Sequence, residues 1–231
     1  MVTGIPGTKK LVYQFSEGDA SMASLLGGKG SNLCEMVRLR LPVPPGFIIS
    51  TETCLDYFKR SDHLPDGLAD TIRSNVGQLE EAMGRKFGSA DRPLLVSVRS
   101  GAGVSMPGMM DTILNLGIND AVTEGLASEM GDLRPALDAH RRFLQNYADV
   151  VMEVDPGVFE EILTYHKNRT GMTEDYELTP ETLRKVIDDF KSAILQAAGT
   201  DIPTDPWDQL LAATEAVFRS WNNPRAIFYR N

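Results

Sequence analysis

The sequence predicts an α/β lobe that is interrupted by a helical insertion. In residues 1–118, short apolar runs alternate with helical patterns, and such alternation is typical of α/β structure. From about residue 119 onward the pattern is almost entirely helical. We therefore expect a discontinuous α/β lobe in residues 1–118 plus 204–231, and a helical insertion subdomain in residues 119–203.

In the first part, three apolar runs predict strands, at residues 11–15, 47–50 and 94–98, and the last is expected to be the most buried. A helix is expected to open at residues 27–30 (Gly-Gly-Lys-Gly) and to stop before the prolines at 42–45. Ser50 or Thr51 is expected to cap the next helix.

In the second part, helix starts are marked by an oxygen-bearing residue that precedes a proline. This signal occurs at Asp155-Pro156, Thr179-Pro180 and Asp205-Pro206. A helical stripe of apolar residues then follows Thr179, and we interpret it as helix packing. The stripe consists of Leu183, Val186, Ile187, Phe190, Ile194 and Leu195. Residues 225–230 are expected to form a strand or an extended connection.

The composition excludes several classes of protein. The net charge of -9 argues against a protein that holds nucleic acid by broad electrostatic attraction, but not against a local phosphate site. No signal peptide and no membrane span are expected, so a cytoplasmic location is predicted. Cys34 and Cys54 are expected to be reduced thiols, and the scattered histidines (His63, His140 and His166) show no zinc-site spacing.

The segment 97–112 is the first candidate for chemistry. A predicted strand ends at Arg99 in a loop that contains three glycines and several hydroxyls, and such a loop can bind an anion through backbone N–H groups. Arg99 adds a planar fork suited to phosphate oxygens. An ordinary surface loop is the alternative, and the cluster of Met106, Met109 and Met110 argues against it, because exposed methionines are costly in a loop without a function.

The second candidate is the helix start at residues 27–30. Glycines before a helix leave its first N–H groups free for an anion, and Lys29 adds a positive charge. The segment is not a Walker A loop, since Gly30 follows the lysine where Ser or Thr would be needed. Taken alone, the segment favours a capped helix start with a solvated lysine.

Together these motifs identify a resemblance that covers nearly the whole chain. The combination resembles the pyruvate, phosphate dikinase family, and the segment from Ser105 to Thr112 is its specific part. The resembling segments are 27–33, 43–47 (Val-Pro-Pro-Gly-Phe), 97–101 (Ser-Val-Arg-Ser-Gly), 105–112 (Ser-Met-Pro-Gly-Met-Met-Asp-Thr) and 115–117 (Asn-Leu-Gly).

The resemblance implies an incomplete ATP-grasp-type lobe that binds ATP phosphates. The family reaction interconverts ATP, phosphate and pyruvate with AMP, pyrophosphate and phosphoenolpyruvate through a phosphorylated histidine. By resemblance, Lys29 and Arg99 contact the phosphates, and a covering segment lies over the transferred groups. That segment consists of Gly108, Met109, Met110, Asp111 and Thr112.

The same resemblance implies partners and cofactors outside the chain. The ligands of Mg²⁺, a second ATP-grasp lobe and the phosphohistidine domain are expected beyond Asn231, so no catalytic residue and no metal ligand is assigned here. No nucleic-acid or membrane partner is expected, and a homodimer of the full-length protein stays an option. The isolated chain is expected to bind ATP weakly or not at all and to be inactive.

Two other interpretations stay open. The chain could be a stand-alone, truncated binding or interaction module, which a coding frame continuing past Asn231 with another lobe would exclude. It could also belong to a related dikinase with another acceptor, such as phosphoenolpyruvate synthase. The segment 105–112 disfavours that second alternative, and the acceptor used by the full-length protein would decide it.

Overall fold

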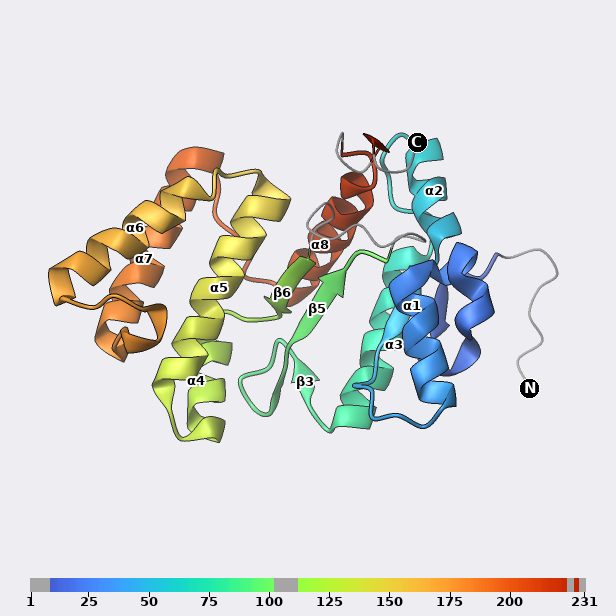
Figure 1. Cartoon of the computed structure of the whole chain (residues 1–231), viewed down its shortest axis with the longest axis horizontal. Helices are drawn as coiled ribbons and strands as arrows, with labels where there is room; N and C mark the ends of the chain where they lie inside the picture. Colours follow the sequence, from blue (N-terminus) through green and yellow to red (C-terminus); the bar gives the residue numbers. More distant parts are fainter. Residues whose placement is uncertain (1–8, 102–111, 224–226, 229–231) are drawn as a thin grey trace. The chain divides into compact units, whose positions relative to one another are not determined.

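The computed structural model describes residues 9–101, 112–223 and 227–228, and the chain divides into two compact units. Unit 1 comprises Met1–Met83, Ser100–Met110 and Phe218–Asn231. Unit 2 comprises Gly84–Arg99 and Asp111–Val217. Each unit combines helices with small two-stranded sheets (Figure 1). The structure is therefore consistent with the expected α/β class, whereas the predicted division at residues 118 and 204 remains a prediction.

Unit 1 is built around an antiparallel pair of strands. Its elements are β1 (Val12–Gln14), the 3₁₀ helices η1 (Phe15–Glu17) and η2 (Ala20–Met22), α1 (Ala23–Arg38), β2 (Phe47–Ile49), α2 (Thr51–Lys59) and α3 (Leu68–Met83). In the pair, Val12 lies opposite Ile49 and Gln14 opposite Phe47. The strands predicted at 11–15 and 47–50 are thereby confirmed to within one residue at each end.

The start of α2 shows how a local sequence signal fixes a helix end. Ser50 is the N-cap, and its side-chain oxygen accepts a hydrogen bond from the Thr53 N–H at 3.2 Å. Behind this cap, Tyr57 is fully buried, and its ring lies 5.3 Å from that of Phe218. The cap and the aromatic contact together hold α2 against the core of unit 1.

Unit 2 contains two further strand pairs. Its strands are β3 (Lys86–Phe87), β4 (Pro93–Leu94), β5 (Val96–Arg99) and β6 (Thr112–Leu116). β3 pairs with β4 in parallel, and β5 pairs with β6 antiparallel, with an irregular register between Val96 and Val98.

The prediction of one buried strand at residues 94–98 is wrong in two respects. The run divides at Leu95 into the end of β4 and the beginning of β5. Leu94 is buried, whereas β5 alternates between half-buried and exposed residues. The sequence alternates apolar and polar residues from Val96 to Arg99, but the adjoining Leu94 and Leu95 made the whole stretch resemble one continuous apolar run.

The helices of unit 2 pack on one another and on β6. They are α4 (Asp120–Met130), α5 (Leu133–Met152), α6 (Gly157–Thr170), α7 (Pro180–Ala198) and α8 (Pro206–Ser220), with the 3₁₀ helix η3 (Asp175–Glu177) before α7. The last three residues of α8 belong to unit 1. α5 contacts α4, α7 and β6, and α6 packs on α7. Figure 1 draws α5 in yellow, and α6 and α7 in orange.

The predicted helix starts are confirmed with one shift. Thr179 caps α7 through a hydrogen bond from the Thr182 N–H, and Asp205 accepts one from the Trp207 N–H at the start of α8. Asp155 accepts from the Gly157 N–H, but α6 begins after Pro156 rather than at it.

Two other expectations are wrong. Leu195 was expected in the packed stripe of α7 but is 47% exposed, because it lies one position beyond the buried face that ends with Ile194. Residues 227–228 are helical rather than extended, since the Ile227 N–H donates to the Asn223 carbonyl four residues earlier. Neither Cys34 nor Cys54 forms a disulfide, as expected, and burial raises the pKa of Cys34.

Candidate functional site

Helix α1 is broken at Gly27, directly before Lys29. Gly27 has φ 71° and ψ 161°, which is not a helical conformation, so a new helical segment begins after it. The first N–H groups of such a segment have no intrahelical acceptors and carry the positive end of the helix dipole. The expected helix start at residues 27–30 therefore exists, although one helical turn precedes it.

The side chain of Lys29 is exposed at this new helix start, while the residues that follow it are buried. Gly30 and Ser31 lie inside unit 1, and a Cβ on Gly30 would be only 3.0 Å from Ile48 Cδ1 of β2. The helix thus packs closely on the strand and presents Lys29 outward. In the part of the chain that the structure describes, Lys29 takes part in no ion pair.

The predicted motif at residues 97–112 contains two positions that are paired in a strand pair. Arg99, the last residue of β5, lies opposite Thr112, the first residue of β6. The antiparallel pairing holds Arg99 and Thr112 side by side, and Arg99 is exposed at the end of β5. Of the other predicted residues, Gly108, Met109, Met110 and Asp111 lie outside the described residues.

The entry of this loop approaches the break in α1. Ser100 is buried, and the carbonyl oxygen of Gly101 lies so close to Gly27 that a Cβ on Gly27 would be 1.3 Å from it. Gly27 and Gly101 both belong to unit 1. Two segments more than seventy residues apart in the sequence are thereby in backbone contact, one just before Lys29 and the other just after Arg99.

Both motifs lie in parts of the chain that match the model of one protein family. The model of the family described as "Pyruvate phosphate dikinase, AMP/ATP-binding domain" matches residues 23–66 and 60–231. The chain belongs to this family. The resemblance stated from the motifs alone is confirmed.

Individual pyruvate, phosphate dikinases are similar to the chain over nearly all of its length. The protein of Clostridium symbiosum is 50% identical over 222 residues, and that of Rhizobium meliloti (strain 1021) is 50% identical over 226 residues, each covering 96% of the chain. The chloroplastic pyruvate, phosphate dikinase 1 of Oryza sativa subsp. japonica is 48% identical over 231 residues, and this match covers 98% of the chain. The chain spans about a quarter of the length of these curated relatives.

Two further features of this dikinase-family chain concern metal-binding groups and membrane-spanning helices. Among residues 9–101, 112–223 and 227–228, no three His, Cys, Asp or Glu side chains are grouped so that they could hold a metal ion. None of the helices in the described ranges is long and apolar enough to cross a bilayer.

Sequence reasoning assigned roles to the two glycine-containing motifs, but no individual role to Gly27 or Gly101. Both glycines were counted only as parts of flexible motifs, and neither was placed among the expected site residues. A signal was present, since Gly27 stands two residues before the candidate lysine and Gly101 two residues after the candidate arginine. Their contact could not be predicted, because periodicity and spacing carry no information about which distant backbones meet.

A separate polar site lies in unit 2 between α4, α5 and α7. These helices enclose a half-open cavity of about 440 Å³ whose wall includes Asp120, Thr123, His140 and Lys191. The Thr123 hydroxyl donates to the Asn119 carbonyl at 2.8 Å, so its only proton is used, and it accepts a hydrogen bond from His140 Nδ1 at 3.1 Å. The Nδ1 atom of His140 therefore carries a proton.

Burial makes His140 hard to protonate. The ring is 3% exposed, and burial together with the charge of Lys191 lowers its pKa to about 4, against an opposing effect of Asp120. Burial would raise the pKa of Asp120, but the hydrogen bond and charge of Lys191 outweigh it and lower that pKa. The pKa of Asp120 therefore lies below the pH range between about 4 and 6.5, in which the folded and unfolded chains differ in the protonation of His140.

We expect His140 to make the protein less stable as the pH falls from 6.5 to about 4. In this range the unfolded chain binds a proton at this histidine and the folded chain does not, so the free energy of unfolding rises with pH. The depressed pKa contributes about 3 kcal/mol to the free energy of unfolding. This contribution is fully present above pH 6.5 and is lost by about pH 4. Urea unfolding at a series of pH values measures it.

The matched variant for this experiment is His140→Gln. It removes the titrating group and leaves all carboxylates in place, so the difference between the two pH profiles isolates the histidine. Parallel profiles for the two proteins between pH 6.5 and 4 would contradict the prediction.

Proposed function

We propose that the chain supplies the ATP-phosphate-binding part of a pyruvate, phosphate dikinase. Lys29 and Arg99 contact the phosphates of ATP, and the segment from Gly108 through Met109, Met110 and Asp111 to Thr112 covers the transferred phosphoryl groups. Membership of a family described as an AMP/ATP-binding domain supports this proposal.

The observation that carries the proposal is the break in α1 at Gly27. It supplies a helix N-terminus in the middle of a packed element and adds an exposed ammonium group in its first turn. Backbone N–H groups and a lysine at one helix start make a suitable site for a negatively charged group.

The geometry at Arg99 gives independent support. Arg99 is the last residue of β5 and is held opposite Thr112 by antiparallel pairing. From this position its guanidinium can donate two parallel hydrogen bonds to phosphate oxygens. Phosphoryl transfer depends mostly on positioning and on neutralising charge, which are the contributions that Lys29 and Arg99 can make.

The activity of the whole protein is part of the proposal. It interconverts ATP, phosphate and pyruvate with AMP, pyrophosphate and phosphoenolpyruvate, with the phosphocarrier histidine and the magnesium ligands outside the residues of this chain. In this view residues 1–118 plus 204–231 form part of an ATP-grasp lobe and residues 119–203 an insertion, in a cytoplasmic enzyme. The isolated chain does not turn over.

We test the proposed function with Lys29→Met in the full-length enzyme. We expect the KM for ATP to rise by about tenfold or more, because the variant removes a phosphate contact while keeping the length of the side chain. Lys29→Arg keeps the charge and serves as the comparison. An unchanged KM and kcat in Lys29→Met would remove Lys29 from the site.

Calorimetry on residues 1–231 tests the statement about the isolated chain. We expect weak or undetectable binding of ATP, because the lysine and arginine alone leave the adenine and the metal without partners. A micromolar dissociation constant would contradict this expectation.

A further inference from the structure

We infer that Gly27 is a positioning residue for the nucleotide. Its backbone contact with Gly101 fixes the entry of the loop that follows Arg99 against the helix start that carries Lys29. This inference rests on the proposed function of the lysine, and it adds residues that the phosphate contacts themselves do not include. Three features of the described residues support it.

The first feature is the backbone conformation of Gly27. A φ of 71° with a ψ of 161° lies in a region that residues with a Cβ hardly enter. The break in α1 is therefore available to glycine and to almost no other residue. Any side chain at this position would favour continuation of the helix. The first N–H groups of the helical segment that begins after Gly27 would then form intrahelical hydrogen bonds and would no longer be free for a ligand.

The second feature is the lack of space beside Gly27. An added Cβ would be 1.3 Å from the Gly101 carbonyl oxygen and 2.4 Å from its carbonyl carbon, distances that no packing can accommodate. Both groups are backbone, so neither can move by a change of rotamer. The residue has to be glycine for the Gly101 backbone to lie where it does.

The third feature is the asymmetry of the contact. A Cβ on Gly101 would meet only the Leu26 carbonyl oxygen among the described residues, at 3.7 Å, which is an ordinary contact. Nor does Gly101 have a positive φ, since the positive-φ glycines do not include it. The same substitution on the two sides of one contact should therefore have very different effects.

Positioning at this point matters because phosphoryl transfer tolerates little displacement. A misplacement of about 1 Å can reduce an enzymatic rate by about 10²-fold even when it originates away from the reacting atoms. Gly27 stands two residues before Lys29, and Gly101 two residues after Arg99. A shift at their contact is passed on to the backbone next to each of the two cationic residues.

The test is steady-state kinetics of the full-length enzyme that carries Gly27→Ala. We expect kcat/KM for ATP to fall by about 10- to 100-fold, with the KM for the acceptor pyruvate unchanged. Gly101→Ala should also lower kcat/KM for ATP, but its loss should be several-fold smaller than the loss caused by Gly27→Ala. Gly77→Ala in α3, where an added Cβ meets nothing within 4 Å, should not differ from the wild type.

The possible outcomes separate this inference from the proposed function. If Lys29→Met impairs the use of ATP and Gly27→Ala does not, the positioning role is wrong and the phosphate site stands. If neither variant has an effect, the proposed function fails as well. Equal losses in Gly27→Ala and Gly101→Ala would contradict the asymmetric contact.

A second measurement applies if Gly27→Ala does not fold. In the wild-type full-length enzyme, hydrogen exchange is followed with and without an ATP analogue that cannot be hydrolysed. We expect the amides of residues 28–30 and 100–101 to gain protection together. Protection of only one of these two segments would overturn the inference.

Discussion

Replacing Arg99 by alanine is expected to reduce the turnover of the full-length enzyme by about 10²- to 10³-fold, the scale observed when one preorganised donor to a developing charge is removed. The side chain is exposed at the end of β5, so its loss removes no core packing. We therefore expect the melting temperature to stay unchanged. Turnover with saturating ATP and a thermal unfolding curve measure the two quantities.

Arg99→Lys distinguishes a planar fork from a simple positive charge. Lysine keeps the charge but presents one ammonium group, so it should restore only part of the activity. Arg73→Ala on α3 is the control for the loss of an exposed arginine, and it should leave turnover unchanged. A rate for Arg99→Ala equal to that of Arg73→Ala would exclude Arg99 from the phosphate site.

Local signals in the sequence predicted much of the fold. The strands β1 and β2 and the starts of α7 and α8 follow from short patterns, because a capping oxygen or an apolar run acts within a few residues. The stripe of α7 predicted its buried face for the same reason, and it failed only at Leu195, which is rotated by about 100° around the helix from the buried Ile194.

Contacts between distant segments could not be predicted in this way. The motifs indicated Lys29 and Arg99, but not the register that places Arg99 opposite Thr112, nor the contact of Gly27 with Gly101. The proton on Nδ1 of His140 likewise depends on a hydrogen bond to Thr123 of another helix. These features result from tertiary packing, for which a single sequence gives no spacing rule.

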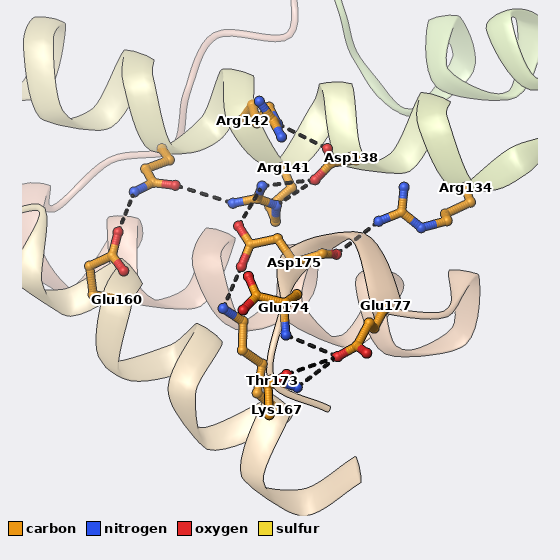
Figure 2. Close-up of polar contacts among 11 residues, drawn as sticks. Arg134, Asp138, Arg141, Arg142, Glu160, Lys167, Thr173, Glu174, Asp175 and Glu177 are labelled. Carbon is orange, nitrogen blue, oxygen red and sulfur yellow. Dashed lines mark hydrogen bonds and ion pairs between the residues drawn. The ribbon is translucent and has the colours of Figure 1, made fainter. Parts of the chain in front are cut away.

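The clearest example is the buried arginine of α5. Arg141 is 3% exposed, and its guanidinium donates to Asp138 on its own helix at 2.9 Å and to Asp175 of η3 at 3.3 Å (Figure 2). It also donates to Gln145, one turn along α5, at 3.3 Å. Helical spacing predicts the contact with Asp138, whereas Asp175 is 34 residues away.

Further ion pairs and hydrogen bonds extend this network to α6 and η3. Asp175 also pairs with Lys167 of α6, and its backbone carbonyl accepts a hydrogen bond from Arg134 at 2.8 Å. Burial would raise the pKa of Asp175, but Lys167 and Arg141 outweigh it and lower that pKa. Within the described residues, no fully buried side-chain nitrogen or oxygen lacks a hydrogen-bond partner.

Replacing Arg141 by alanine is therefore expected to lower the free energy of unfolding by about 3 kcal/mol, and by no more than about 5 kcal/mol. Removing one partner of a buried ion pair leaves desolvated carboxylates and a cavity behind. Asp138 and Asp175 each keep a second cation, Arg142 and Lys167, which places the cost near the lower value. Urea unfolding at pH 7 measures it.

Arg142→Ala is the matched control for that experiment, because both arginines bind the same Asp138 carboxylate from adjacent positions of α5. The Arg142 side chain is 57% exposed and that of Arg141 only 3%. An exposed ion pair contributes about 0–1 kcal/mol, so Arg142→Ala should cost less than about 1 kcal/mol. If burial and the link to η3 determine the stability, the two variants must differ by at least about 2 kcal/mol. Equal losses would show that the shared contact with Asp138 accounts for the whole effect, and that the distant contact with Asp175 contributes nothing.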